Sequence, residues 1–194
     1  AFAEVTFLKN FKFTWTSGVN VDETRSTNTT NPYYGTYASS NGMVYKYHTR
    51  SISWNHQQLL NWEQEFGDHN IQAMAGHEYY RSKYYYLYGS KSNQFDPTND
   101  ELAGAITDKS SNSYRSDYNT EGYFGRIMYD YDERYHISAS YRRDASSRFH
   151  KDNRWGNFWS VGAAWVISKE DFFNASWVDL LKLKASYGEQ GNDQ

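Results

Sequence analysis

A regular alternation of apolar and polar residues along much of the chain restricts its fold more than any other feature. From Tyr135 to Tyr141 every second residue is aromatic or aliphatic, and the residues between them are polar. The same pattern recurs in segments 11–21 and 159–168. A repeat of two residues is the period of a β-strand that has one apolar and one polar face. Segment 11–21 is ~11 residues long, which is the length that a tilted membrane strand requires.

The alternation predicts an all-β chain of about seven antiparallel strands, joined up and down. Two of these strands are less regular, because His56 and Gln58 interrupt one and Met74 falls on the polar side of another. The predicted strands are 11–21, 44–66, 71–78, 123–131, 135–142, 159–168 and 181–188.

The connections between these strands alternate in length. We expect long polar loops at 23–42 and 89–113, and tight turns at 66–70 and 132–134. Loop 148–153 is intermediate, and 168–178 is a moderate exception on the short side. Both prolines, Pro32 and Pro97, fall in the long loops, where no ladder hydrogen bond is lost. Long loops at one end and short turns at the other are typical of an outer-membrane β-barrel.

The composition leaves a choice between a barrel and a soluble β-protein. Aromatic residues make up 19% of the 194 residues, which argues against the disorder that a mean hydropathy of -0.94 would otherwise suggest. The rings could fill a sandwich core, form a sugar-binding surface or form the aromatic belts of a barrel. Rings near strand ends, as at Trp159 and Trp165, and a polar opposite face on nearly every strand favour the barrel. A soluble β-sandwich that binds carbohydrate remains the alternative.

The two folds differ in which residues contact solvent. In a barrel one set of side chains would face lipid and the alternating charged set would line the interior. The expected lipid-facing residues are Trp15, Ile127, Ile137, Val161, Trp165 and Leu183, and the expected interior residues are Lys12, Arg126, Arg142 and Lys184.

Several classes of function find no support. A formal net charge of -3 gives no electrostatic case for nucleic-acid binding. The absence of cysteine removes disulfides, thiolate catalysis and cysteine metal sites. His77-Glu78 lacks the second histidine of a zinc helix, and the carboxylates at 130–133 are expected in a solvated turn rather than a glycosidase cleft. We therefore expect neither an enzyme nor a cofactor. No stretch approaches the ~18 apolar residues of a membrane helix.

From residue 123 to 192 a series of blocks occurs in one order and spacing. The blocks are 129–135 (YDYDERY), 137–144 (ISASYRRD), 146–149 (SSRF), 153–156 (NRWG), 160–165 (SVGAAW), 167–170 (ISKE) and 183–192 (LKASYGEQGN). This third of the chain resembles the SusC/RagA class of TonB-linked outer-membrane transporters. Residues 1–122 fit the neighbouring strands of such barrels by pattern only. The family usually has glycine where Ala145 stands, so a turn with φ > 0 would be penalised here.

The resemblance implies a plugged barrel of the 22-stranded transporter type in the cell outer membrane. It implies an N-terminal plug that interacts with the TonB complex, a SusD-like surface lipoprotein as partner, and oligosaccharides or peptides as substrates. Seven strands cannot close such a barrel. We therefore expect residues 1–194 to be a partial barrel domain, with the plug and the remaining strands absent and no transport by this piece alone.

Candidate substrate-contact residues come from three places. In segment 79–88 the rings of Tyr80, Tyr84 and Tyr86 could stack on sugars or peptide side chains, or could form an aromatic belt. Tyr33 and Tyr34 in the first long loop have the same two interpretations. Arg142 and Arg148 could contact substrate or plug, or could simply solvate the inner wall and fix the register.

Overall fold

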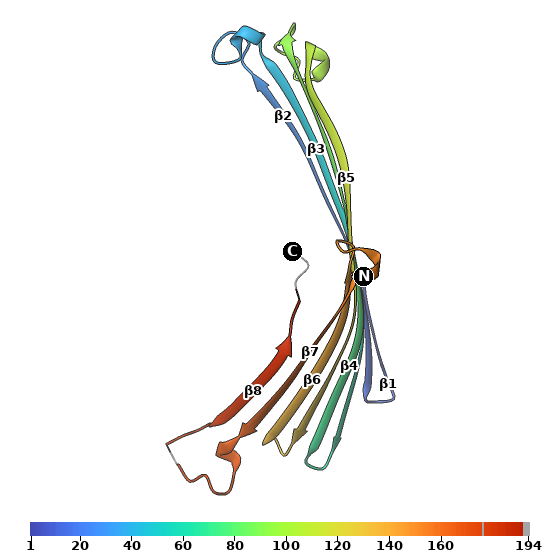
Figure 1. Ribbon diagram of the computed structural model, residues 1–194, viewed down its shortest axis with the longest axis vertical. Helices are drawn as coiled ribbons and strands as arrows, with labels where there is room; N and C mark the ends of the chain where they lie inside the picture. The colour runs from blue at the N-terminus through green and yellow to red at the C-terminus, as the bar shows by residue number, and fades with distance from the viewer. Residues whose placement is uncertain (176, 192–194) are drawn as a thin grey trace. The chain divides into compact units, whose positions relative to one another are not determined.

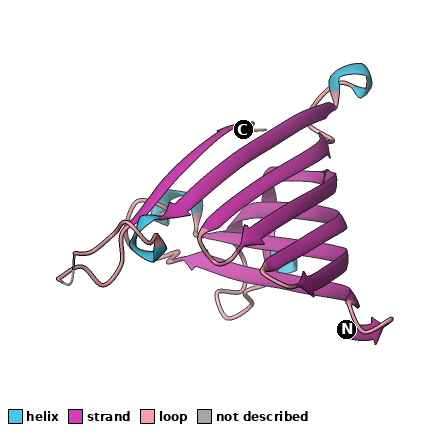
Figure 2. Cartoon of the chain, turned by 90° about the horizontal axis from the view of Figure 1, so that it is seen from below, coloured by secondary structure: helices cyan, strands magenta, loops and turns pink. Residues whose placement is uncertain are grey.

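The computed structural model describes residues 1–175 and 177–191, and its strands form one 8-stranded sheet in chain order, β1 to β8 (Figure 1). Short 3-10 helices lie in the connections between strands (Figure 2). The strands are β1 Phe2–Phe7, β2 Phe11–Thr30, β3 Met43–Phe66, β4 His69–Gln94, β5 Ala105–Tyr131, β6 Tyr135–Ser146, β7 Trp155–Val166 and β8 Lys182–Glu189. The 3-10 helices are η1 Ala38–Ser40, η2 Leu102–Gly104, η3 Lys151–Asn153 and η4 Ile167–Lys169. The predicted all-β, antiparallel, up-and-down class is confirmed.

The sheet has eight strands where about seven were predicted, because β1 was not among the predicted strands. This strand is 6 residues long, and Phe2 breaks its alternation. It pairs with β2 through partners such as Phe7 with Phe11 and Val5 with Phe13, so it extends an apolar face that β2 already has. The hydrogen bonds of a neighbouring strand stabilise a segment whose own pattern is weak.

The predicted loops 23–42 and 89–113 were too long. Strand β2 continues to Thr30 and β4 to Gln94, whereas β3 begins at Met43 and β5 at Ala105. The added strand residues are polar on both faces, so their sequence shows no apolar period. Alternation in the sequence indicates a strand with one apolar face. A strand that contacts water on both faces shows no alternation, and the hydrogen bonds to its neighbours are enough to stabilise it. Pro32 and Pro97 still lie in the connections.

The chain divides into two compact units. The first unit comprises 1–18, 55–80 and 119–194, and the second comprises 19–54 and 81–118. Strands β2 to β5 contribute to both units, whereas β1, β6, β7 and β8 belong to the first.

In the first unit the two faces of the sheet have opposite chemistry. Ile127 lies opposite Ala139, and Ala139 lies opposite Val161, so this row of the sheet is apolar. One row further along, Arg126, Ser140, Ser160 and Gly188 lie side by side on the polar face. Ile127 is 58% exposed and Leu183 is 61% exposed. A soluble sandwich packs two sheets over such a face, but the described residues form one sheet, and its apolar face is open. The sandwich alternative is therefore not supported.

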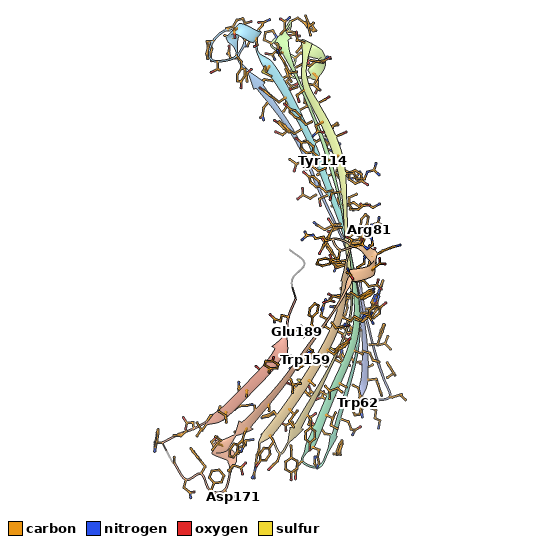
Figure 3. The ribbon with its side chains drawn as sticks, in the orientation of Figure 1. Trp62, Arg81, Tyr114, Trp159, Asp171 and Glu189 are labelled. Atoms are coloured by element: carbon orange, nitrogen blue, oxygen red, sulfur yellow. The ribbon has the colours of Figure 1, made fainter. Side chains whose placement is uncertain are left out.

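Aromatic rings border the apolar face of the first unit at both ends. Near the short turns the rings of Tyr131, Tyr135 and Trp165 follow one another at centroid distances of 6.3 and 6.5 Å. At the other end Tyr123 packs on Trp155, and Trp159 packs on Tyr187. The members of these two belts that Figure 3 labels are Trp62, at the turn end, and Trp159. Tyr135 and Tyr141 are ~20 Å apart along β6, close to the ~25 Å height of a barrel's apolar band.

Ala145 does not occupy a turn. It lies in β6, pairs with Trp155 of β7 and is 6% exposed. It is not among the residues with positive φ, so alanine is not penalised at this position.

Candidate functional site

The second unit carries a concentration of tyrosine on one face of its two central strands. Tyr47 of β3 packs on Tyr88 of β4 with ring centroids 4.7 Å apart. Tyr84 and Tyr86 of β4 both pack on Tyr114 of β5, at 5.9 and 5.0 Å. Alternate residues of a strand share a face, and we call this surface the tyrosine face. Its tyrosines are Tyr45, Tyr47, Tyr84, Tyr86, Tyr88 and Tyr114, the last of which is labelled in Figure 3.

The packing of these rings raises the pKa of the hydroxyl groups of Tyr84 and Tyr47. Partial burial among neighbouring rings, followed by the proximity of Tyr114, raises the pKa of Tyr84 above its ordinary value of 10.0. Partial burial, with Tyr88 next, raises the pKa of Tyr47 in the same direction. Each hydroxyl is therefore a neutral donor and acceptor at physiological pH.

The opposite face of the same strands is charged. Lys83 lies 6.0 Å from the Trp54 ring centroid, and Arg115 lies 5.4 Å from that of Tyr85. Arg81 pairs with Asp117 at 3.4 Å. A hydrocarbon-facing surface excludes such a density of charge. This part of the sheet therefore contacts water on both faces.

Glu23 of β2 is the acidic centre of a further group on the second unit. Its carboxylate accepts hydrogen bonds from Arg25 at 2.7 Å and contacts His48 Nε2 at 2.9 Å. These two contacts hold the pKa of Glu23 below its ordinary value of 4.5.

The structure separates the predicted tyrosine candidates into three places. Tyr84 and Tyr86 lie on the tyrosine face, whereas Tyr80 belongs to the first unit. Tyr33 and Tyr34 lie in the connection between β2 and β3 and are 77% and 73% exposed.

The loop tyrosines are positioned by a local turn. The side-chain oxygen of Asn31 accepts hydrogen bonds from the backbone N–H groups of Tyr33 and Tyr34, at 2.8 and 3.3 Å. An Asx turn of this kind fixes the backbone and leaves the rings outside it. Within the described part of the chain neither ring stacks on another, so the structure does not bring them onto the tyrosine face.

Sequence reasoning missed Tyr45, Tyr47 and Tyr114 as members of this surface. Tyr114 follows a segment that was predicted to be a loop, and the β3 tyrosines lie in the least regular predicted strand. The signal that could have found them is the repeat of tyrosine at every second position, at 45 and 47 and again at 84, 86 and 88.

Arg142 of the first unit is held in an ion-pair network. Its Nε donates to both carboxylate oxygens of Asp144 at 2.8 and 2.6 Å, its Nη2 contacts Glu78, and its Cζ lies 5.2 Å from the Phe124 ring centroid. A Cβ at Gly122 would lie 2.4 Å from Asp144 Oδ1 and 3.0 Å from Arg142 Nη2. Glycine at this position therefore leaves the space that the network occupies.

Arg148 is the second arginine that was predicted as a candidate. It lies in the exposed connection after β6, where its backbone N–H donates to Ser146 Oγ at 3.3 Å. The side chains of His77 and Glu78 lie on opposite faces of β4. His77 contacts Gln58 and Glu121, whereas Glu78 binds Arg142. Within 1–175 and 177–191 no three histidine or acidic side chains cluster as metal ligands would.

A hollow of about 660 Å³ lies on the polar face of the first unit. Arg126 and Lys184, which were expected in the interior, both line it, and Gly162, Ala164 and Ser186 are among its small residues. The polar face is thus concave and charged, while the apolar face is exposed and bordered by rings. An antiparallel sheet with these two faces is a piece of a transmembrane β-barrel wall.

Comparison with known proteins identifies the barrel. Residues 3–192 match the family described as TonB dependent receptor-like, beta-barrel. The chain belongs to this family, and it is a segment of an outer-membrane transporter barrel rather than of an enzyme. No helix among the described residues is both long enough and apolar enough to cross a membrane. The end of the matched region, including Asn192 of the last sequence block, lies outside the described residues.

The similar proteins agree with the SusC/RagA resemblance. TonB-dependent receptor P39 of Formosa agariphila is 34% identical over 145 residues, which are 71% of this chain and 14% of the receptor. TonB-dependent receptor SusC of Bacteroides thetaiotaomicron is 43% identical over 70 residues, 36% of this chain and 7% of SusC. The chain thus spans about 14% of the length of the first of these relatives.

Solved structures show the same relationship. The RagAB peptide transporter superposes with a TM-score of 0.90 at 26% identity, covering 96% of this chain and 21% of the transporter chain. The ferric citrate transporter FecA superposes with a TM-score of 0.53 at 6% identity, covering 86% of this chain and 24% of FecA. The second likeness shows the fold alone.

Proposed function

We propose that this chain is a wall segment of a TonB-dependent importer that takes up oligosaccharides or peptides together with a SusD-like surface lipoprotein. The observation that carries the proposal is the exposed apolar face between two aromatic belts, backed by a concave charged face. The similarity to SusC and to a structure described as a peptide transporter supports these two substrate classes.

In this proposal residues 1–194 are a partial barrel domain. The plug, the segment that engages the TonB complex and the remaining strands belong to the rest of the parent protein. The small share of each relative that the chain covers, 14% of the P39 receptor and 21% of the RagAB transporter chain, supports this division.

The substrate-contact residues of the proposal are the tyrosines of the second unit, led by Tyr84 and Tyr86. Tyr33 and Tyr34 are exposed where a passing substrate can reach them. Arg142 is saturated by two carboxylates, which favours a role in fixing the wall over direct contact with substrate.

Uptake in living cells tests the proposal. The parent gene is deleted and restored in its own organism, and import of fluorescent oligosaccharides and peptides is measured with TonB present and absent. The proposal expects import that needs the parent gene, TonB and the partner lipoprotein. Import that survives loss of TonB would sink it, as would fractionation of the parent protein as a soluble monomer without detergent.

A further inference from the structure

The central strands of the second unit present an uncharged surface of unusual uniformity. At positions 45–53 of β3 and 82–92 of β4, the alternate residues on the tyrosine face all carry hydroxyl groups. The hydroxyl residues of β3 are Tyr45, Tyr47, Thr49, Ser51 and Ser53, and those of β4 are Ser82, Tyr84, Tyr86, Tyr88, Ser90 and Ser92.

The charges of these two strands lie on the other face. There the alternate positions hold Lys46, His48 and Arg50 on β3, and Arg81, Lys83 and Lys91 on β4. Glu101 pairs with Lys46, and Asp117 pairs with Arg81. The charged side chains of these two strands therefore occupy one face, and the uncharged hydroxyl side chains occupy the other.

The rings of the tyrosine face form a platform rather than a packed core. Tyr114 is 52% exposed, and the rings of β3 and β4 are half-buried. Their centroid spacings of 4.7 to 5.9 Å are those of rings that touch. The half-buried hydroxyl residues Thr49, Ser51, Ser53 and Ser82 continue the surface, whereas Ser90 and Ser92 are buried.

This chemistry matches one ligand class better than another. A sugar ring has C–H faces that stack on an aromatic ring, and a rim of hydroxyls that exchange hydrogen bonds with neutral donors and acceptors. A peptide brings charged termini and ionised side chains, for which β3 and β4 offer no partner on this face. An acidic glycan brings carboxylates, and the cations that would bind them lie on the opposite face.

We propose that the tyrosine face binds an uncharged oligosaccharide, with sugar rings stacked on Tyr47, Tyr86 and Tyr114. This inference rests on the proposed import function and narrows it to one substrate class. The ligand lies across β3, β4 and β5, and the hydroxyls of Thr49, Ser51, Ser53 and Ser82 bind its rim.

Binding to the purified parent protein tests the inference. The full-length parent is extracted in detergent and applied to an array of neutral gluco-, manno-, xylo- and galacto-oligosaccharides, with oligogalacturonides and a decapeptide library on the same array. A neutral oligosaccharide from the array is then titrated by calorimetry. We expect binding to a neutral glycan that weakens roughly tenfold for each of Tyr47→Ala and Tyr86→Ala.

Tyr85→Ala is the matched control, because Tyr85 lies on the same strand between two of these tyrosines and packs on Arg115 of the opposite face. It should leave glycan affinity unchanged. Tyr47→Phe and Tyr86→Phe keep the ring and should lose less than the alanine variants. A heat-dependent shift in electrophoretic mobility confirms that each variant is a folded barrel.

Three results would overturn the inference. One is binding of peptides or oligogalacturonides alone, and another is equal loss of glycan binding in Tyr85→Ala. The third is loss of lipoprotein co-purification with unchanged glycan affinity, which would make the face a protein-docking surface. TonB-dependent uptake of peptides through the same parent would leave the import function standing while this inference fails.

Discussion

The hydroxyl of Tyr135 donates a hydrogen bond of 2.6 Å to Glu170 Oε1, which joins the first residue of β6 to the end of η4. The indole N–H of Trp165 donates to the same oxygen at 2.8 Å. These two bonds, made by rings of the turn-side belt, lower the pKa of Glu170 below its ordinary value of 4.5. A carboxylate thus anchors the belt where the strands end.

The anchor should fail in acid. Because the folded-state pKa of Glu170 is depressed, its contribution to stability is present above pH 4.5 and is lost as the pH falls through the lower folded value. We expect the Trp165 indole to lose its fixed environment over that interval. Trp165 fluorescence during an acid titration of the detergent-folded parent measures this, and Glu170→Gln is the control. A Trp165 signal that titrates equally in Glu170→Gln would contradict the assignment.

A second pH-sensitive contact lies at the same end of the first unit. Lys169 pairs with Glu133 and holds the pKa of Glu133 below 4.5. Both groups are exposed, so we expect Glu133→Gln to lower the unfolding free energy only slightly, and less at high salt than at low salt. Denaturant unfolding at low and high salt measures the change. A larger effect that persists at high salt would show that the contact is more than a screened surface pair.

Gly122 should resist substitution by alanine. Its Cβ would lie 2.4 Å from Asp144 Oδ1 and 3.0 Å from Arg142 Nη2, so the ion pair of these two side chains would have to shift. We expect Gly122→Ala to cost about 1–3 kcal/mol of unfolding free energy. Gly125→Ala is the matched control three residues away, because the nearest atom to its Cβ is a backbone oxygen at 3.4 Å. Equal costs for the two variants would rule out the steric explanation.

Arg142 should be coupled energetically to Glu78. Removal of either side chain leaves the other charge without that partner on a half-exposed wall. We expect Arg142→Ala to cost about 1–2 kcal/mol, and a double-mutant cycle with Glu78→Gln to give a coupling of about 1 kcal/mol. The control is Arg126→Ala, since Arg126 has no ion pair within the described residues, and its cost should be near zero. An additive cycle would show that the two residues act independently.

A charged side chain should have opposite effects on the two faces of β6. Ile137 belongs to the apolar face and Ser138 to the polar face. We expect Ile137→Arg to destabilise the barrel by about 2–4 kcal/mol and Ser138→Arg to be tolerated. Folding efficiency into lipid vesicles, scored by heat-dependent mobility, measures the difference. Nitroxide labels at the same two positions should report lipid contact at 137 and not at 138, so equal relaxation at both would contradict the alternation.

The sequence predicts the first unit well because one of its faces is dry. Ile137, Ala139 and Tyr141 each alternate with a polar residue, and this pattern is what fixes β6, β7 and β8. Prediction from alternation fails where both faces of a strand contact water. Residues 23–30 and 105–113 form strands through pairing with their neighbours, and their Thr, Ser and Asn content is that of a loop. Strand β1 was not predicted because Phe2 places a ring on its polar face and so breaks the alternation of the sequence.

The candidate site was predicted only in part for the same reason. Tyr84 and Tyr86 were singled out from a tyrosine run, but that run does not reveal which rings of other strands lie beside them. Which strand supplies Tyr114 and Tyr47 as neighbours is a property of the sheet order, which lies beyond any single segment. The contact between Arg142 and Glu78 could not be predicted from the sequence, because the two residues are 64 positions apart.

The extension of β3 and β4 into the second unit has a consequence for how such receptors diversify. Loops change their recognition by insertion and deletion, and each change in length moves every side chain beyond it. A paired ladder holds its backbone path whatever side chains it carries, so Tyr47 or Tyr86 can be exchanged singly while their neighbours stay in place. The specificity of such a recognition surface can therefore change through single substitutions, while the backbone and the neighbouring side chains keep their positions.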